Sequence, residues 1–364
     1  MPGWIITKRL IANHIFVSII GLVITYRYVV FEVFMENLIF SLNATLPIFL
    51  LMVLGYVFNK LHIIDEKAAT WMNKFVFKIA LPVLLFEDLA EQDFAGTWNG
   101  KFVLFCFMVT LLSILIITLI SRLIIRNKAE RGEFIQGAYR SSAALLGIAF
   151  IHNIYGTGST GMAPLMIIGS VPFYNIFAVI ILMLTAPKSA VLGRYTSEDN
   201  NSEVVQKELF KKTLIGIIKN PILIGIFCGL IWSLLKLPIP KIMGSMVSSV
   251  GGLATPLGLM SMGATFDFAK AINKIKPTLL ASFIKLFALV GVFMPLAVAI
   301  GFRDEQIIAI LVMLGSATTV SSFVMAKNMG HEGTLSSSII MMTTFGCSFS
   351  LTFWLFVLKT LSII

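Results

Sequence analysis

The amino-acid sequence contains one segment twice, at positions that differ by 174 residues. The residues that return without any gap are two prolines, two glycines and an alanine: Pro47, Gly55, Ala80, Pro82 and Gly156 recur as Pro221, Gly229, Ala254, Pro256 and Gly330. The prolines set the offset, and the other pairs then match without adjustment. Each copy holds an odd number of hydrophobic segments, so the two copies have opposite orientations in a membrane. Such an inverted repeat is typical of secondary transporters.

The composition places this chain in a lipid bilayer. Hydrophobic residues make up 57% of the sequence and charged residues only 13%, whereas soluble domains have about 25% charged residues. The apolar residues form near-continuous runs of about 20, the length of a helix that spans a membrane. Basic residues lie between these runs and not in one patch, so the net charge of +10 predicts no nucleic-acid partner.

Ten membrane-spanning helices can be placed after residue 35, five in each copy. In the first copy they cover 37–58, 66–86, 102–125, 133–154 and 163–186, and in the second 213–235, 244–265, 277–300, 306–327 and 335–358. The predicted fold class is therefore an all-α polytopic membrane protein with a five-plus-five inverted repeat. The copies occupy 35–187 and 213–364, and the polar segment 188–212 links them.

Lysine and arginine predict the orientation. Sixteen of them flank the helix ends on the side of the linker, and five flank the ends on the opposite side. Because positive residues remain in the cytoplasm, the linker 188–212 is expected inside and both ends of the ten-helix unit outside. We expect a multi-pass protein of the plasma membrane.

Residues 1–34 fall outside the repeat. They contain an apolar stretch of sixteen residues between basic ones. An eleventh span, a signal segment, and sequence upstream of a true start at Met35 are all compatible with this pattern. We favour the third interpretation.

Small polar residues cluster in the fourth and ninth predicted spans, at 139–156 and 315–330. At the repeat offset Ser142 corresponds to Ser316, and inverted-repeat carriers bind substrate where such equivalent positions meet near the midplane. A broken helix there presents N–H groups to an anion. Close packing of small residues is the alternative interpretation. The predicted substrate-binding residues are Ser141, Ser142, Ser316, Thr318 and Thr319, and the predicted crossover or hinge positions are Gly147, Ala149, Gly315, Pro82 and Pro256.

Few charged or amide side chains lie inside the predicted spans, and each has two interpretations. Lys78 is deep enough to face a cavity, and Lys285 either extends outward or balances the charge of an anion. Asn175 is equally consistent with helix–helix contact and with substrate binding. Arg140, seven residues into the fourth span, is expected to reach the cytoplasmic headgroups.

The sequence lacks the residue patterns that a carboxylate proton relay, a metal site or a catalytic nucleophile needs. No Asp or Glu lies deep within a span, so a carboxylate proton relay has no members. The three cysteines occupy different spans without metal-ligand spacing, and no nucleophile–base pair is present. We therefore predict neither a cofactor nor an enzyme. A coupling ion, Na⁺ or H⁺, stays open, and a cation would need backbone, Ser, Thr or Asn oxygens.

Four segments carry a resemblance to a known family: LPIFLLMVLGYVFNKLHIID at 46–65, KNPILIGIFCGLIWSLLKLPIP at 219–240, GGLATPLGLMSMGATF at 251–266 and SSFVMAKNMG at 321–330. They resemble the auxin efflux carrier family, whose prokaryotic members include malate and malonate permeases. The resemblance covers about 35–364 and implies crossed helices in spans 4 and 9 and organic-anion substrates. Two departures stand out, because the family has proline near Ala149 and at Thr318.

These patterns together predict a secondary carrier of small organic anions, such as carboxylates, that works by alternating access. Its expected partners are the anion and the lipid bilayer, and a homodimer stays open. A sodium-coupled symporter of the bile-acid or arsenite type is a second hypothesis. A transport-like channel or membrane sensor is a third.

Overall fold

The computed structural model describes residues 45–90, 98–143, 162–187 and 219–364, with Ile151, Ile154, Tyr155 and positions 32, 35–36, 38–40 and 42–43. The predicted linker 188–212 and all but one residue of the predicted extension 1–34 lie outside the described residues. The described part of the chain contains helices and no strand.

The helices of the first copy are Leu38–Lys60, α2 (Glu66–Phe75), the π-helical turn η1 (Val76–Ala80), α3 (Leu81–Ala90), α4 (Gly100–Ile124), α5 (Lys128–Tyr139) and α7 (Met162–Thr185). Those of the second copy are α10 (Pro221–Leu234), α11 (Lys241–Gly252), α12 (Ala254–Ala264), α13 (Phe268–Asn273), α14 (Ile275–Phe283), the π-helical turn η2 (Ile284–Ala288), α15 (Leu289–Ile300), α16 (Asp304–Gly315), α17 (Ser321–Asn328) and α18 (Thr334–Thr360).

Local sequence explains where many of these helices begin. The residue before the first turn is an Asp or Asn whose side chain accepts a hydrogen bond from a free backbone N–H of that turn, as at Asp65, Asn99, Asn127, Asn220 and Asp267. Proline also marks an irregular point. Pro82, which lacks an N–H, is the second residue after η1, and the last hydrogen bond of that turn joins Leu81 N to Val76 O.

Seven helical segments in the described residues are long and apolar enough to cross a membrane. They are Leu38–Lys60, Glu66–Ala90, Gly100–Ile124, Met162–Thr185, Lys241–Ala264, Ile275–Ile300 and Thr334–Thr360, and α10 is a shorter apolar helix. Their bounds agree with seven of the predicted spans to within about four residues. The fourth and ninth predicted spans are missing from this set because α5 and α16 end within them.

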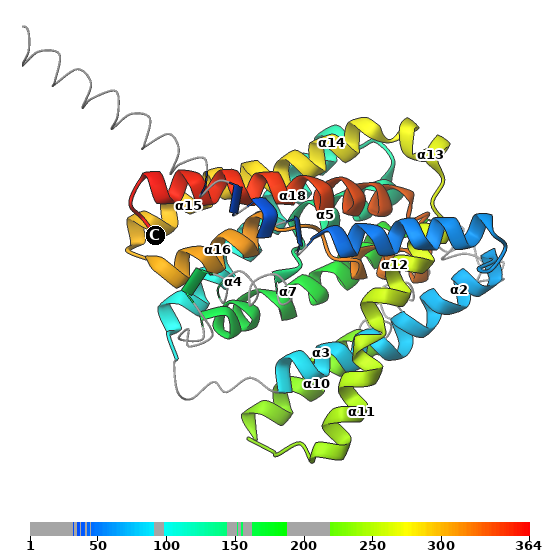
Figure 1. Cartoon of the computed structure of the whole chain (residues 1–364), viewed down its shortest axis with the longest axis horizontal. Helices are drawn as coiled ribbons and strands as arrows, with labels where there is room; N and C mark the ends of the chain where they lie inside the picture. The colour runs from blue at the N-terminus through cyan, green and yellow to red at the C-terminus, as the bar shows by residue number, and fades with distance from the viewer. Residues whose placement is uncertain are drawn as a thin grey trace, which may run out of the picture.

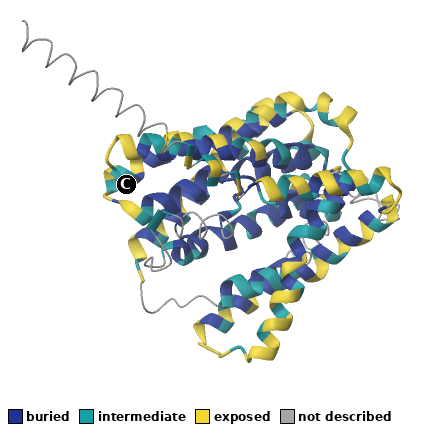
Figure 2. Cartoon of the chain, viewed as in Figure 1, coloured by how far each residue is buried: buried dark blue, intermediate teal, exposed yellow. Residues whose placement is uncertain are grey.

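The helices form two groups (Figure 1). We call Leu38–Lys60, α2, η1, α3, α10, α11 and α12 the panel bundle, and α4, α5, α7 and α14–α18 with η2 the core bundle. Burial is concentrated in the core bundle (Figure 2), where every residue from Ile307 to Gly315 of α16 is buried. In contrast, large apolar side chains on outer helices are exposed, as with Leu123 and Ile242. Exposed leucine and isoleucine of this kind suit contact with lipid tails.

The repeat found in the sequence recurs in the positions of the helices. Adding 174 to the bounds of Glu66–Ala90 gives 240–264, and the corresponding helical segment is Lys241–Ala264. The same operation on Met162–Thr185 gives 336–359, within α18. Segments related by the offset therefore have similar lengths and the same order.

Two glycines that are related by the repeat make equivalent contacts. Gly55 packs against the backbone of Met260 in α12, and Gly229 packs against the backbone of Phe86 in α3. Both members of each contact differ by 174 from their counterparts, so one packing arrangement occurs twice. The first helix of each copy packs on the second helix of the other copy, and the two copies interlock.

Replacement of Gly55 tests this packing. A Cβ there would lie 2.2 Å from Met260 O, whereas a Cβ at Gly244 in α11 meets nothing nearer than 3.5 Å. We expect Gly55→Ala to destabilise the protein by about 1–3 kcal/mol, the cost of overpacking, and Gly244→Ala to leave stability equal or slightly higher. Unfolding in detergent measures both. Equal midpoints for Gly55→Ala and the wild type would contradict the close approach.

Candidate functional site

Two helices end inside the core bundle, and their ends meet. α5 ends at Tyr139, and Arg140 continues in an extended conformation. α16 ends at Gly315, after which Ser316 is extended and α17 begins at Ser321. Ser142 N donates a hydrogen bond of 2.9 Å to Ala317 O, so the two breaks lie against each other. These two breaks lie within the polar clusters identified from the sequence in the fourth and ninth predicted spans.

Thr318 satisfies the end of α5. Its hydroxyl donates 2.7 Å to Gly137 O, a carbonyl of the last turn, and its backbone N–H donates 3.1 Å to Thr343 Oγ1. A helix that ends away from water needs such donors for its final carbonyls. Thr318 stands where the resembled family has proline, so here a threonine that donates one hydrogen bond from its side chain and one from its backbone accompanies the break.

Side chains from three other segments satisfy the end of α16: the extended residues after α5, α7 and η2. Met313 O accepts hydrogen bonds from the hydroxyl of Ser141 and from that of Tyr174, the latter at 3.2 Å. Leu314 O accepts one of 2.5 Å from Lys285 Nζ. Lys285, in η2, is fully buried, and its ammonium also donates to Ser141 Oγ. It forms no ion pair with any carboxylate of the described residues.

Arg140 lies at the end of α5, and the expectation that it reaches the headgroups is wrong. Its side chain is 2% exposed, its guanidinium donates to Asn175 Oδ1 in α7, and it contacts Met325 Sδ. Within the described part of the chain Asn175 is its only oxygen acceptor. A guanidinium has five N–H donors, and a buried one whose donors are not all used can bind an anion.

A cavity of about 630 Å³ lies between the two bundles at this point. The panel bundle lines one side through residues of α3, α11 and α12, and the core bundle lines the other. Its polar and charged lining residues are Asp88, Arg140, Ser141, Ser142, Tyr174, Asn175, Thr255, Thr318, Thr319, Ser321 and Thr344.

Five of the predicted substrate-binding residues line this cavity, namely Ser141, Ser142, Asn175, Thr318 and Thr319. Three do not. Ser316 is buried, and its hydroxyl has no hydrogen-bond partner among the described residues. Lys285 lies behind Ser141, and Lys78 in η1 is exposed.

The predicted hinge positions have different surroundings. Gly315 is the last residue of α16. Pro82 follows the π-helical turn η1, and Pro256 lies in the first turn of α12, just after the irregular residue Leu253. Gly147 and Ala149 lie outside the described residues.

The prediction of site residues omitted Arg140, Tyr174 and Asp88, which all line the cavity. The sequence marks Arg140 as unusual, because an arginine inside a predicted span is costly, but its position in the span does not show that it is buried. Asp88 lies near the Ala90 end of α3, the end predicted to face outward.

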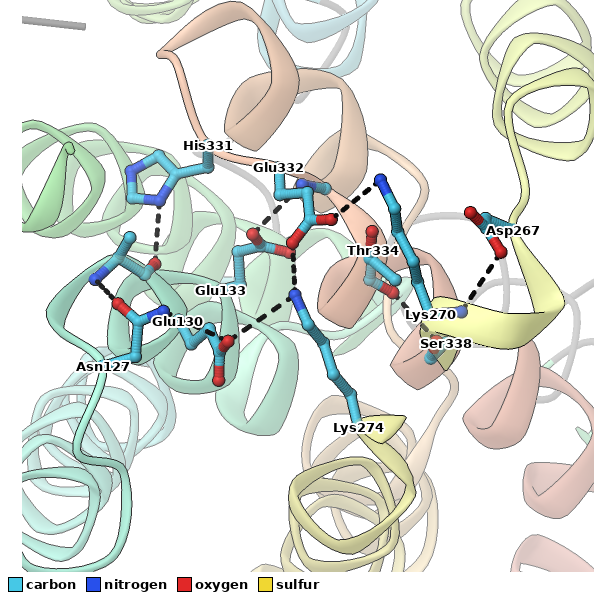
Figure 3. Close-up of polar contacts among 12 residues, drawn as sticks. Asn127, Glu130, Glu133, Asp267, Lys270, Lys274, His331, Glu332, Thr334 and Ser338 are labelled. Atoms are coloured by element: carbon cyan, nitrogen blue, oxygen red, sulfur yellow. Dashed lines mark hydrogen bonds and ion pairs between the residues drawn. The ribbon is translucent and has the colours of Figure 1, made fainter. Parts of the chain in front are cut away.

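A second polar cluster lies where α5, α14 and α18 begin (Figure 3). Lys274 forms a hydrogen-bonded ion pair with Glu332, and its Nζ lies 3.6 Å from Glu130 Oε1. Lys270 Nζ lies 3.3 Å from Glu332 Oε1 and forms a further ion pair. Glu133 accepts from Ser336 N at 2.8 Å, which satisfies the start of α18. These contacts join the ends of three core helices on the predicted cytoplasmic side.

The ion pair shifts the pKa of both partners. The hydrogen bond from Lys274 lowers the pKa of Glu332 below its ordinary value, although partial burial acts in the opposite direction. Partial burial lowers the pKa of Lys274, but the hydrogen bond and charge of Glu332 outweigh it and leave that pKa raised. Both shifts favour the charged pair.

Comparisons with known proteins agree with this architecture. The family model described as Membrane transport protein matches residues 40–355. An uncharacterized transporter of Methanothermobacter thermautotrophicus is 23% identical over 319 residues, which cover 87% of this chain and 98% of that relative. The solved structure of the sodium proton antiporter MjNhaP1 from Methanocaldococcus jannaschii matches with a TM-score of 0.52 at 16% identity, covering 90% of this chain and 98% of the antiporter. At that identity the likeness shows a shared fold and nothing about the ions carried.

The capping role of Thr318 has a direct test. Thr318→Val removes the hydroxyl and leaves Gly137 O buried without its donor, which costs about 1–3 kcal/mol. Thr318→Ser keeps the hydroxyl and should lose less than half of that. Unfolding in detergent compares the two variants. If valine and serine destabilise equally, the hydrogen bond to Gly137 O contributes nothing.

A double-mutant cycle on Lys274→Met and Glu332→Gln tests the second cluster. At neutral pH we expect a coupling of about 0.3–1 kcal/mol, because Glu332 is partly exposed. The folded-state pKa of Glu332 is depressed, so its contribution is present above the unfolded pKa and is lost as the pH falls through the folded pKa. Additive single effects at neutral pH, or a coupling unchanged in acid, would contradict the pairing.

Proposed function

Because the chain belongs to the membrane transport protein family, the auxin efflux carrier family, we propose that it is a secondary carrier of small organic anions. Membership in a transporter family indicates transport and not catalysis. The observation that carries the anion assignment is Arg140, a buried guanidinium in the wall of the cavity whose only described oxygen acceptor is an amide.

The charges around the cavity support an anion. Among the lining residues that the structure describes, Arg140 is the one cation and Asp88, near the end of α3, is the one carboxylate. Lys285 adds a second cation next to Ser141. α17 begins at Ser321, which lines the cavity, so the positive end of the dipole of this helix faces the cavity as well. A guanidinium binds carboxylate through two parallel hydrogen bonds, and hydroxyls such as those of Ser142 and Thr319 can hold the rest of a polar substrate.

The place of the cavity supports alternating access. Its walls come from both bundles, so movement of the core bundle against the panel bundle would open and close it. The volume of about 630 Å³ lies in the range of small-molecule sites. On the panel side the lining residues of α3 run from Leu81 to Asp88, toward the end predicted to face outside.

The finer architecture remains part of the proposal. We propose ten spans in a five-plus-five inverted repeat, with 35–187 and 213–364 as its halves and the linker 188–212 in the cytoplasm. The interlocked contacts of Gly55 and Gly229 and the matching helix bounds support the repeat. The plasma membrane as location, malate or malonate as substrate and a homodimer as assembly rest on the sequence and on the family resemblance.

Uptake into proteoliposomes tests this function. A panel of radiolabelled mono- and dicarboxylates is offered while sodium, proton and voltage gradients are varied one at a time. We expect saturable uptake of at least one carboxylate by the wild type. Arg140→Gln should reduce it by about 10- to 100-fold, the value of a charge-assisted hydrogen bond.

Arg122→Gln is the matched control, because Arg122 is exposed near the end of α4 and does not line the cavity. Its uptake should equal that of the wild type. The unfolding midpoint of Arg140→Gln shows whether its loss of uptake occurs in folded protein. If the wild type moves no carboxylate under any gradient, or folded Arg140→Gln transports normally, this function is wrong.

A further inference from the structure

Lys285 differs from Arg140 in the number of oxygens that its charged group contacts. Its ammonium contacts three oxygens: Leu314 O at 2.5 Å, Met313 O at 3.4 Å and the hydroxyl of Ser141. An ammonium has three N–H donors, so this set of contacts uses all of them. The side chain is fully buried and does not line the cavity.

The charge of Lys285 is stabilised by dipoles and not by a carboxylate. Met313 and Leu314 supply carbonyls of the last turn of α16, the negative end of that helix. Ser141 follows the end of α5 and bridges the ammonium to Met313 O. In the described residues Lys285 has no ion-pair partner.

These ligands are of the kind that holds a monovalent cation. Secondary carriers coordinate a coupling Na⁺ with carbonyls of unwound backbone and with the C-terminal ends of half-helices near the bilayer midplane. Here the carbonyls come from the end of α16 next to its break, and a hydroxyl completes the set. Two further buried hydroxyls without a described partner occur on the same segments, Ser316 in the break and Ser282 one turn before Lys285.

We propose that Lys285 Nζ is a tethered cation that occupies a coupling-ion site, so that this carrier moves its anion without sodium. The ammonium occupies the carbonyl end of α16, and Na⁺ finds its oxygens already engaged. The transport part of this proposal rests on the function proposed above, whereas the ion site itself does not.

The test removes the tether and asks whether a free cation takes its place. In Lys285→Ala the oxygens of Met313, Leu314 and Ser141 lose their donor, so Na⁺ should bind and stabilise the fold. We expect the unfolding midpoint of this variant to rise saturably with sodium chloride, by about 3 °C or more, with choline chloride holding the ionic strength constant. The wild type should show no such rise. Ser141→Ala added to Lys285→Ala should weaken it.

Lys101→Ala is the matched control. Lys101 also donates to a carbonyl at a helix end, Ile300 O at 2.9 Å, but in an exposed position. Its loss should create no sodium dependence. Lys285→Gln, which keeps most of the side-chain volume, replaces the alanine variant if the latter does not fold.

The outcomes separate the two proposals. A sodium-dependent midpoint in the wild type, or none in any folded Lys285 variant, overturns the tethered cation. Neither measurement requires a transported substrate, so the result holds even if no carboxylate is carried. In uptake experiments that do succeed, wild-type flux should be the same in sodium and in choline, and strict sodium dependence would also overturn the proposal.

Discussion

The structure depends on one constraint: two helices end in the interior of a membrane protein, and the carbonyls at their ends must find donors there. A carbonyl that is buried away from water and left unsatisfied costs several kcal/mol. Thr318 supplies the donor for α5, and Ser141, Tyr174 and Lys285 supply the donors for α16. The polar centre of the molecule exists because those ends exist.

The same constraint explains why two buried cations lie at this centre. Each broken helix presents the negative end of its dipole, and each has a cation beside it, Arg140 after α5 and Lys285 at the end of α16. Their differences follow from their partners. The donors of Lys285 are taken up by oxygens, which suits a fixed structural charge, whereas Arg140 faces the cavity with donors to spare, which suits a carboxylate that arrives and leaves.

Much of the fold could be predicted from the sequence, because a repeat offset and apolar runs of span length are properties of the chain alone. The breaks near Ser142 and Ser316 could also be placed, since both lie in clusters of small polar residues at equivalent positions of the repeat. The depth of Arg140 could not, because counting residues into a straight helix fails when that helix ends at Tyr139. The exposure of Lys78 and the contacts of Lys285 depend on how each helix is rotated about its axis, and one lysine in an apolar run does not specify that rotation.

The sign of the charge that crosses the membrane tests the central claim most directly. Proteoliposomes adsorbed on a solid-supported electrode receive a pulse of malate, malonate or another carboxylate, in choline and without sodium. The account predicts a saturable current carried by negative charge, which Arg140→Gln abolishes. No current with any carboxylate, together with a current when sodium alone is pulsed, would show that the cavity serves a cation and would contradict the account.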